Sequence, residues 1–200
     1  SRLSKLLIDF CLSSFEELYD RITSVRDPSM VEKVIDAITT NETLWFRDIT
    51  PWIILEEVLL PVYVNELRER KRLRVRIWSA ACSTGQEPYS TAMCIDNYLA
   101  KNNIKDNISI MRGLPGEYKE KYFRYEGFGW VLSDNIRNAV SFRQLNLQRD
   151  ITIVDIFDVV FCRYVIIYFS ADLKREVLKN IALALKKNGV LFIGSSELIN

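Results

Sequence analysis

The amino-acid sequence predicts an α/β protein, because two apolar strands are each followed by a helix with one apolar face. The stretch Val75–Met93 begins with alternating apolar residues, passes through a turn of small residues and continues as a helix from Glu87-Pro88. The nearly continuous apolar run Phe157–Cys162 is typical of a central parallel strand, and Ser170 is the expected cap of the following helix. A turn of small residues between a strand and a helix brings backbone N–H groups close to a ligand.

The first part of the chain is predicted to be helical. Residues 1–38 carry the apolar spacing of three short amphipathic helices. Ser14 followed by Glu17 resembles a capping box at the start of the second helix, and Asp27-Pro28 separates that helix from the third. A longer helix is expected over Pro51–Glu66, before the first predicted strand.

Further elements are expected in the second half of the chain. Asn107–Ile110 has the pattern of a second strand, and Gly127–Gly129 that of a turn within an aromatic-rich region. Apolar and polar residues alternate over Val140–Arg143, which predicts a strand. The helix after Ser170 is expected to continue through two lysines and to end at Gly189, with a last strand over Val190–Gly194.

Composition excludes several classes of function. The chain has 200 residues, 48% of them hydrophobic, which is enough for a substantial core. Its net charge of +1 does not favour binding to nucleic acid or to a membrane surface. No apolar run approaches the roughly 20 residues that span a bilayer, and the N-terminal pattern is not that of a signal peptide. We therefore expect a cytoplasmic protein without membrane insertion.

The side chains available for chemistry are also restricted. The sequence has no histidine, which excludes Ser-His-Asp and Cys-His nucleophiles and metal sites with histidine ligands. Its four cysteines show no C-x-x-C spacing, so we expect reduced thiols and no metal. Any reaction must therefore depend on carboxylates, lysine, arginine, tyrosine or a cofactor.

A basic run follows the predicted helix that ends near Glu66. Six of the nine residues from Arg68 to Arg76 are basic, a composition that suggests nucleic-acid binding. Because no aromatic residues that could stack on bases alternate with the charges, we favour a solvated helix end and expect no nucleic-acid partner.

Three longer motifs stand out in the sequence: S-A-A-C-S-T-G-Q-E-P-Y-S from Ser79, T-T-N-E-T-x-x-F-R from Thr39 and F-D-x-x-F-C-R-x-V-x-I-Y-F from Phe157. Together they resemble the CheR family, S-adenosylmethionine-dependent methyltransferases that modify glutamates of chemotaxis receptors. Without the family, the second motif would be interpreted as a helix cap beside core aromatics. The resemblance covers nearly the whole chain.

The resemblance implies a domain organisation. It implies a Rossmann-like class I methyltransferase sheet over residues 51–200 and an N-terminal helical subdomain over residues 1–50, which we expect to be truncated. It also implies a small antiparallel β subdomain at about residues 124–145. In the family, the helical subdomain approaches the receptor, and the β subdomain binds a receptor tail peptide in some members. The oligomeric state stays open, a monomer included.

The resemblance also assigns roles to residues around the reacting groups. Asn41, Thr43 and Arg47 match family residues beside the cofactor and the target glutamate. We assign Arg47 to steering the substrate carboxylate, since its planar guanidinium matches a carboxylate, and Tyr168 to a weaker role beside it. Glu87 is assigned to the ammonium group of the methionine part of S-adenosylmethionine.

Other residues are implied in cofactor binding. The small residues from Ala81 to Gly85 would let the backbone approach the cofactor, and Asn146-Leu147 matches a pair on its adenine side. Tyr164 and Val165 follow the central strand at positions that hold the cofactor in the family. Tyr164 stands where the family has asparagine, and we expect its bulkier side chain either to turn away from the pocket or to narrow it.

One part of the family pattern is missing from the sequence. After its second strand the family has an acidic residue that binds the ribose, followed by a helix, whereas here Ile110 passes directly to Met111. A parallel strand needs a crossover of about a dozen residues or more before the chain returns to the sheet. The segment is either deleted or omitted from the sequence, and we favour omission because a deletion would uncover a face of the sheet.

The predicted activity is transfer of a methyl group from S-adenosylmethionine to glutamate side chains of methyl-accepting chemotaxis receptors, with S-adenosylhomocysteine as the product. A glutamate is already ionised at neutral pH, so the reaction requires no general base. Two alternatives stay open. One is a module that binds the cofactor or the receptor without turnover, and the other is a methyltransferase acting on another nucleophile.

Overall fold

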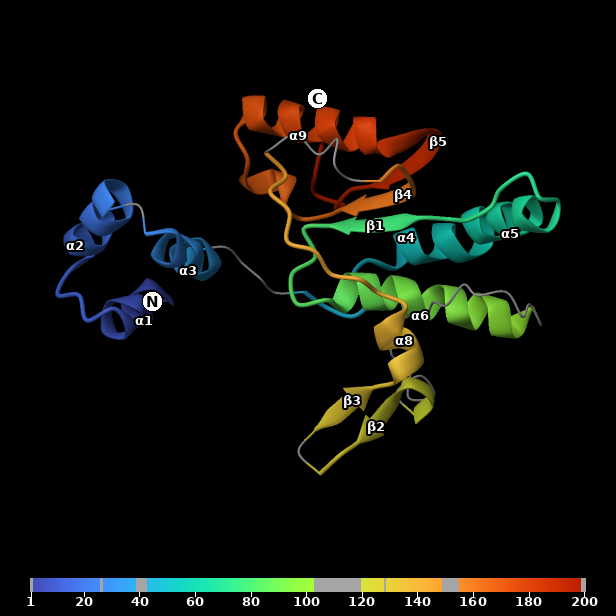
Figure 1. Ribbon diagram of the computed structural model, residues 1–200, viewed down its shortest axis with the longest axis horizontal. Helices are drawn as coiled ribbons and strands as arrows, with labels where there is room; N and C mark the ends of the chain where they lie inside the picture. The colour runs from blue at the N-terminus through green and yellow to red at the C-terminus, as the bar shows by residue number, and fades with distance from the viewer. Residues whose placement is uncertain are drawn as a thin grey trace. The chain divides into compact units, whose positions relative to one another are not determined.

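The computed structural model describes residues 2–25, 27–38, 43–102, 120–127, 129–148 and 155–198. The chain forms two compact units, Ser1–Glu42 and Thr43–Asn200 (Figure 1). Asn41 and the junction between Ile110 and Met111 lie outside the described residues, and so does the strand predicted at Asn107–Ile110. No helix of the described ranges is long and apolar enough to cross a membrane.

The first unit consists of the three predicted helices. They are α1 (Arg2–Asp9), α2 (Phe15–Asp20), which continues into a π-helical turn at Arg21–Val25, and α3 (Pro28–Ile38). Its core is formed by three buried apolar side chains, Leu12, Leu18 and Met30. The hydroxyl of Ser14 accepts a hydrogen bond from the N–H of Glu17 at 3.2 Å, which caps α2. The Glu17 carboxylate bonds Ser13 instead of closing the capping box on Ser14.

The second unit is built on a parallel sheet of strand order β1–β4–β5, as the α/β prediction requires. The strands are β1 (Ile77–Ala80), β4 (Phe157–Cys162) and β5 (Leu185–Phe192). Helix α6 (Gln86–Lys101) follows β1, and α9 (Ala171–Ala184) connects β4 to β5. Helix α9 lies on one side of the sheet, and α4, α5 and α6 lie on the other (Figure 1).

The side chains of β4 show why this strand is central. Val159 and Phe161 belong to the core that β4 shares with α6 and the helices before β1, whereas Val160 and Cys162 belong to the core under α9. All four residues are fully buried. Because successive side chains of a strand point to opposite faces, a strand covered on both faces must be apolar throughout.

A continuous helical stretch precedes β1. It comprises α4 (Ile49–Ile54), a π-helical segment at Leu55–Leu59 and α5 (Leu60–Arg68), and it includes the helix predicted at Pro51–Glu66. Trp52 of α4 is fully buried and stacks on Phe161 of β4 with ring centroids 5.3 Å apart. This stretch fixes the position of residues 43–48 relative to the sheet.

The basic run after α5 is partly used inside the fold. Arg72 forms ion pairs with Glu66 and with Asp158, whose carboxylate is 1% exposed, and Arg76 pairs with Asp155. The amino group of Lys186 in β5 lies 2.7 Å from the same Asp158 carboxylate. Part of the run therefore neutralises a buried acid at the start of β4.

The boundary between α9 and β5 differs from the prediction. The helix ends at Ala184, and the two lysines and Gly189 that were assigned to it lie in β5. Lys186 is held in the strand by Asp158. A Cβ atom on Gly189 would overlap the Leu185 side chain and lie 3.0 Å from the Lys186 carbonyl oxygen. Gly189 therefore permits a close approach within an irregular part of the strand and does not end the helix.

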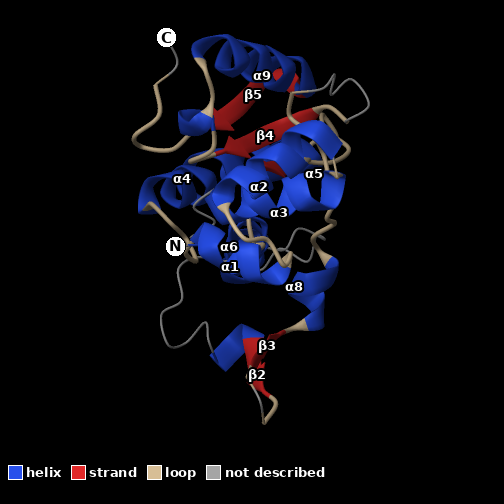
Figure 2. Cartoon of the chain, turned by 90° about the vertical axis from the view of Figure 1, so that its left-hand side faces the viewer, coloured by secondary structure: helices blue, strands red, loops and turns tan. Residues whose placement is uncertain are grey.

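A small antiparallel hairpin follows α6. It consists of β2 (Phe123–Tyr125) and β3 (Trp130–Leu132), with a turn closed by a bond from the Glu126 N–H to the Gly129 carbonyl, and α8 (Asp134–Asn138) comes next. Figure 2 shows the hairpin and α8 away from the parallel sheet. The strand predicted at Val140–Arg143 is wrong, because this stretch has no regular structure. Its Phe142 ring instead packs on Tyr89 of α6.

Candidate cofactor and methyl-transfer site

Three loops meet at the carboxyl edge of the parallel sheet, where ligands bind in open α/β sheets. The loop after β1 begins at Ala81 and ends at Gly85, which both have positive φ values, 62° and 94°. Gly85 is the residue before α6, and a Cβ atom there would lie 3.1 Å from the Tyr89 ring and 3.3 Å from the Phe142 ring. The backbone therefore makes a tight turn directly before the helix, as the sequence predicts.

Glu87 lies in the first turn of α6. One carboxylate oxygen accepts a hydrogen bond from the Ser79 hydroxyl at 2.6 Å, and the other accepts one from Arg163 Nη1 at 3.0 Å. Burial raises the pKa of the Glu87 carboxyl above its ordinary value, while Ser79 and Arg163 act in the opposite direction. Because a carboxylate has about four acceptor positions, these two bonds leave capacity for a ligand ammonium group.

Arg163 is the central residue of the site, and the sequence analysis did not single it out. Its side chain is 2% exposed, and its Nη2 donates to Asp48 Oδ2 at 2.9 Å and to the carbonyl oxygen of Arg47. Its Nε–H is buried and has no hydrogen-bond partner within the described part of the chain. A charged residue directly after the four apolar residues Val159–Cys162 of the central strand is the signal that could have identified it, since buried charges are rare unless paired.

Arg47 is held through its backbone and its side chain. Its carbonyl oxygen accepts hydrogen bonds from Arg163 and from Trp52 Nε1, the latter at 3.4 Å. The N–H of the preceding Phe46 donates to the buried Ser90 hydroxyl of α6 at 3.1 Å. The guanidinium carbon lies 3.6 Å from the centre of the Tyr164 ring, a cation–π contact.

The loop after β4 carries the remaining candidates. Tyr164 has a φ of 60°, its hydroxyl donates to the Asp48 carboxylate, and it lies 2.9 Å from the Ser195 hydroxyl. Val165 packs against the core under α9, whereas the Tyr168 side chain is exposed. The sequence analysis could not find these contacts, because Asp48 and Ser195 are far from Tyr164 along the chain.

A buried carboxylate joins two of the three loops. Glu197 is 4% exposed and accepts hydrogen bonds from the backbone N–H groups of Tyr164 at 2.8 Å, Gly194 at 2.7 Å and Ile167 at 3.3 Å. It therefore fixes the loop after β4 against the loop after β5. The sequence analysis assigned this glutamate no role, since its partners are backbone groups.

The structure thus brings together some of the predicted residues. Arg47, Glu87 and Tyr164 belong to one network through Arg163 and Asp48. Within the described part of the chain, the remaining candidates make no hydrogen bond to this network. These candidates are Thr43, Ala81, Asn146, Leu147, Val165 and Tyr168. Asn146 accepts a bond from the N–H of Gln148 at 2.9 Å, and Leu147 packs under α9.

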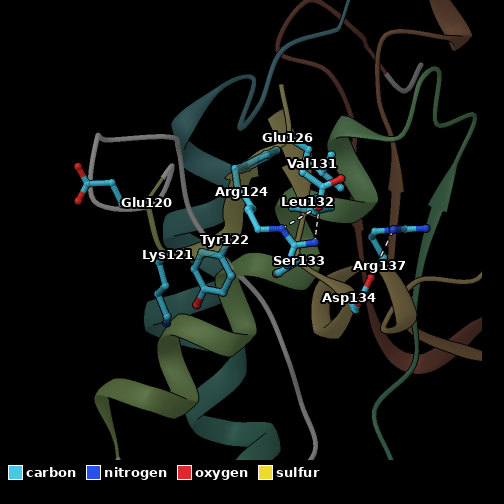
Figure 3. Close-up of a pocket in the computed structure, with 11 residues that line it drawn as sticks. Glu120, Lys121, Tyr122, Arg124, Glu126, Val131, Leu132, Ser133, Asp134 and Arg137 are labelled. Carbon is cyan, nitrogen blue, oxygen red and sulfur yellow. Dashed lines mark hydrogen bonds and ion pairs between the residues drawn. The ribbon is translucent and has the colours of Figure 1, made fainter. Parts of the chain in front are cut away.

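A separate pocket of about 410 Å³ lies between the hairpin and α8 (Figure 3). Its wall is largely polar and contains the ion pairs Arg124–Glu126 and Arg137–Asp134. It shares no residue with the network around Arg163. This pocket therefore belongs to the small antiparallel part of the chain and not to the carboxyl edge of the parallel sheet.

Comparison with known proteins identifies the family. The family profile described as CheR methyltransferase, SAM binding domain matches residues 41–111 and 105–200. The chain belongs to the CheR methyltransferase family. The fold agrees with a class I methyltransferase, and the family uses S-adenosylmethionine, so both predictions are confirmed.

Individual relatives cover almost the entire chain. Chemotaxis protein methyltransferase Cher2 of Pseudomonas putida is 40% identical over 226 residues, covering 100% of this chain and 81% of its own length. Chemotaxis protein methyltransferase 1 of Pseudomonas aeruginosa is 41% identical with the same coverage. Chemotaxis protein methyltransferase 1 of Vibrio cholerae is 38% identical over 222 residues, 98% of this chain and 79% of its own.

The CheR pattern is interrupted in the middle of this chain. Its two matched parts overlap at residues 105–111, and the alignment to the P. putida relative spans 226 residues although this chain has 200. The relative therefore carries residues without a counterpart here. The overlap includes Ile110–Met111, where the sequence lacks the expected acidic residue.

The residues at the carboxyl edge fit S-adenosylmethionine as a CheR methyltransferase would bind it. Glu87 would supply an acceptor for the ammonium group at a helix N-terminus, next to a turn whose backbone has positive φ at both ends. The buried Nε–H of Arg163, which has no partner among the described residues, fits an acceptor of a bound molecule. When bound, S-adenosylmethionine supplies an electrophilic methyl group on a sulfonium.

Proposed function

We propose that this chain transfers the methyl group of S-adenosylmethionine to glutamate side chains of a methyl-accepting chemotaxis receptor. Membership of the CheR family and the names of the relatives, chemotaxis protein methyltransferases, support this proposal. The four cysteines, which show no C-x-x-C spacing, support the further proposal that the protein is cytoplasmic.

The observation that carries the proposal is the placement of Arg47. Its backbone belongs to the network that includes Glu87, the candidate residue for the ammonium of the cofactor. Its guanidinium carbon lies 3.6 Å from the centre of the Tyr164 ring, and a carboxylate is bound by N–H groups in the plane of a guanidinium. Arg47 is therefore suited to hold a substrate carboxylate beside the methionine part of the cofactor.

The reaction is a direct displacement. An oxygen of the ionised substrate carboxylate forms a bond to the methyl carbon, and the bond from that carbon to sulfur breaks with its electron pair left on sulfur. The positive charge of the sulfonium and the negative charge of the carboxylate are both lost. Because the glutamate pKa is ~4.3, no proton has to be removed at neutral pH. Catalysis then consists of positioning, which a site without histidine can provide.

Other residues complete the proposed site. Thr43 and Asn41 would contact the cofactor near Arg47, Ala81 would allow close backbone approach, and Asn146-Leu147 would face the adenine. Tyr168, whose side chain is exposed, would lie beside the substrate carboxylate. In this proposal residues 1–50 form the helical part that approaches the receptor, and the β subdomain extends over about residues 124–145.

The experiment is transfer of a labelled methyl group from S-adenosylmethionine to a purified receptor signalling domain. We expect label on the receptor, no label on a receptor whose target glutamates are replaced by alanine, and none on RNA. Arg47→Lys retains the charge but not the planar fork, so turnover should decrease more than the affinity for S-adenosylhomocysteine. Binding of S-adenosylhomocysteine in calorimetry without any transfer would instead support a non-catalytic module.

A further inference from the structure

Arg47 rests on a side chain that the CheR motif does not have. The resemblance implies asparagine at the position of Tyr164, and the centre of the Tyr164 ring lies 3.6 Å from the Arg47 guanidinium carbon. The Tyr164 hydroxyl is engaged at the far end of the ring by Asp48 and Ser195. An asparagine side chain offers neither an aromatic face nor a hydroxyl at that distance.

The backbone around this contact adopts conformations that its residues disfavour. Tyr164 and Asp48 have φ values of 60° and 57°, in the left-handed region that is uncommon outside glycine and asparagine. Such conformations persist only where surrounding contacts over-determine them, and they cluster at functional sites. At Tyr164 those contacts are the bond from its N–H to Glu197 and the bonds of its hydroxyl.

The Asp48 carboxylate does not cap the helix that it precedes. Asp48 precedes the first residue of α4, where an aspartate normally accepts hydrogen bonds from helix N–H groups, yet it makes no cap bond. It accepts instead from Tyr164 and Arg163, and these hydrogen bonds lower its pKa even though partial burial opposes them. The carboxylate thus joins the Tyr164 ring to the arginine that also binds Glu87.

From this arrangement we propose that Tyr164 is a positioning residue: it sets the plane of the Arg47 guanidinium, and Asp48 and Arg163 hold it in place. The inference rests on the proposed function, because the carboxylate that Arg47 orients is that of the substrate glutamate. The Tyr164 ring is then a platform under the arginine that binds the substrate carboxylate.

The experiment compares Tyr164→Asn with Tyr164→Phe in the full chain. Phenylalanine keeps the ring and loses the hydroxyl, whereas asparagine restores the family residue and loses the platform. In receptor methylation, Tyr164→Asn should lower kcat by about tenfold, the upper part of the range for a cation–π contact, and Tyr164→Phe by less than about threefold. The affinity for S-adenosylhomocysteine should change less than about threefold in both.

A second comparison tests whether Tyr164 acts through Arg47. In an Arg47→Met background, Tyr164→Asn should cause little further loss, because the residue it positions is gone. An equal loss in both backgrounds would overturn the inference, as would unchanged turnover in Tyr164→Asn. A parallel decrease of turnover, S-adenosylhomocysteine affinity and thermal stability would assign Tyr164 a structural role only.

The proposed function and this inference can fail separately. The NMR shift of the Arg47 Nε–H carries the ring current of Tyr164 and does not depend on a substrate. It should be retained in Tyr164→Phe and lost in Tyr164→Asn, even if the wild-type chain methylates no receptor. If the shift is the same in Tyr164→Asn and wild type, there is no platform, whatever the activity.

Discussion

Replacing Arg163 by methionine is the most direct test of the network at the carboxyl edge of the sheet. The substitution keeps a similar volume but removes the cation that lies between the Glu87 and Asp48 carboxylates. Arg163 is 2% exposed at its side chain, so water cannot take its place without rearrangement. Removing one partner of a buried ion pair costs about 3–5 kcal/mol, and we expect a loss in this range at pH 8.

The cost should depend on pH in a defined direction. Burial raises the pKa of Glu87, and Arg163 is one of the groups that limit the increase, while Glu197 adds to it. A carboxyl whose folded pKa is raised destabilises the fold when it ionises, so its penalty develops as pH rises through that pKa. Asp48 has a lowered pKa although burial opposes it, and the part of its stability that comes from Arg163, but not the part from Tyr164, is also lost.

The Glu87 effect makes the variant less stable at pH 8 than at pH 5, relative to wild type, whereas the Asp48 effect is the same at both pH values, which lie above the ordinary pKa of aspartate. We expect the difference in free energy of unfolding to be smaller by about 1–2 kcal/mol at pH 5 than at pH 8. Urea unfolding of both proteins at the two pH values measures it. Arg175→Met is the matched control, because Arg175 is 70% exposed and pairs with Asp172 on the surface of α9. A surface pair contributes about 0–1 kcal/mol.

The reasoning would be refuted by an Arg163→Met variant that loses less than about 1 kcal/mol, the cost of a surface pair. An equal loss at pH 5 and pH 8 would show that Arg163 does not compensate the Glu87 charge. Arg163→Lys should give an intermediate cost, since a single ammonium cannot reproduce the separate Nη1 and Nη2 bonds.

Three further predictions concern individual residues. Glu87→Gln should weaken binding of S-adenosylhomocysteine by about tenfold or more in calorimetry, because a charge-assisted bond is lost, and should also lower the melting temperature, because the buried Arg163 loses an ionic partner; an unchanged affinity would contradict the assignment of Glu87 to the cofactor. Gly189→Ala should destabilise the fold by about 1–3 kcal/mol in urea unfolding, because the added carbon overlaps Leu185, and an unchanged midpoint would contradict this. Burial raises the pKa of Cys162 to about 12, so at pH 8 iodoacetamide should alkylate the exposed Cys11 and leave Cys162 unmodified in mass spectrometry of the folded protein.

The local sequence determined the elements whose burial pattern is strong. Val159–Cys162 is apolar throughout because it is covered on both faces, and that requirement leaves the same signal whichever helices cover it. The turn before α6 was predicted for a similar reason, since its backbone conformation is encoded by the residues that adopt it, above all Gly85. The motifs then identified the family and its cofactor.

Tertiary contacts decided the elements whose local signals are ambiguous. The helical spacing after Ser170 continues past Ala184, yet the chain enters β5 because Lys186 reaches the buried Asp158 and the strand pairs with β4. Val140–Arg143 alternates like a strand but finds no neighbouring strand in the described sheets. A strand is stabilised by its pairing partner, which the local sequence does not contain.

The candidate site, too, was determined partly by the local sequence and partly by tertiary contacts. The sequence identified Arg47, Glu87 and Tyr164 as separate candidates, from motifs that lie more than a hundred residues apart at their extremes. Only the fold shows that Arg163 connects them. It also shows that the Asp48 carboxylate accepts a hydrogen bond from Tyr164 instead of capping α4, and that Glu197 fixes the loop after β4. The physical reason is that hydrogen bonds and ion pairs act over about 3 Å in space, whatever the separation along the chain. A side chain's partners are therefore set by which loops the parallel strands bring to the same edge.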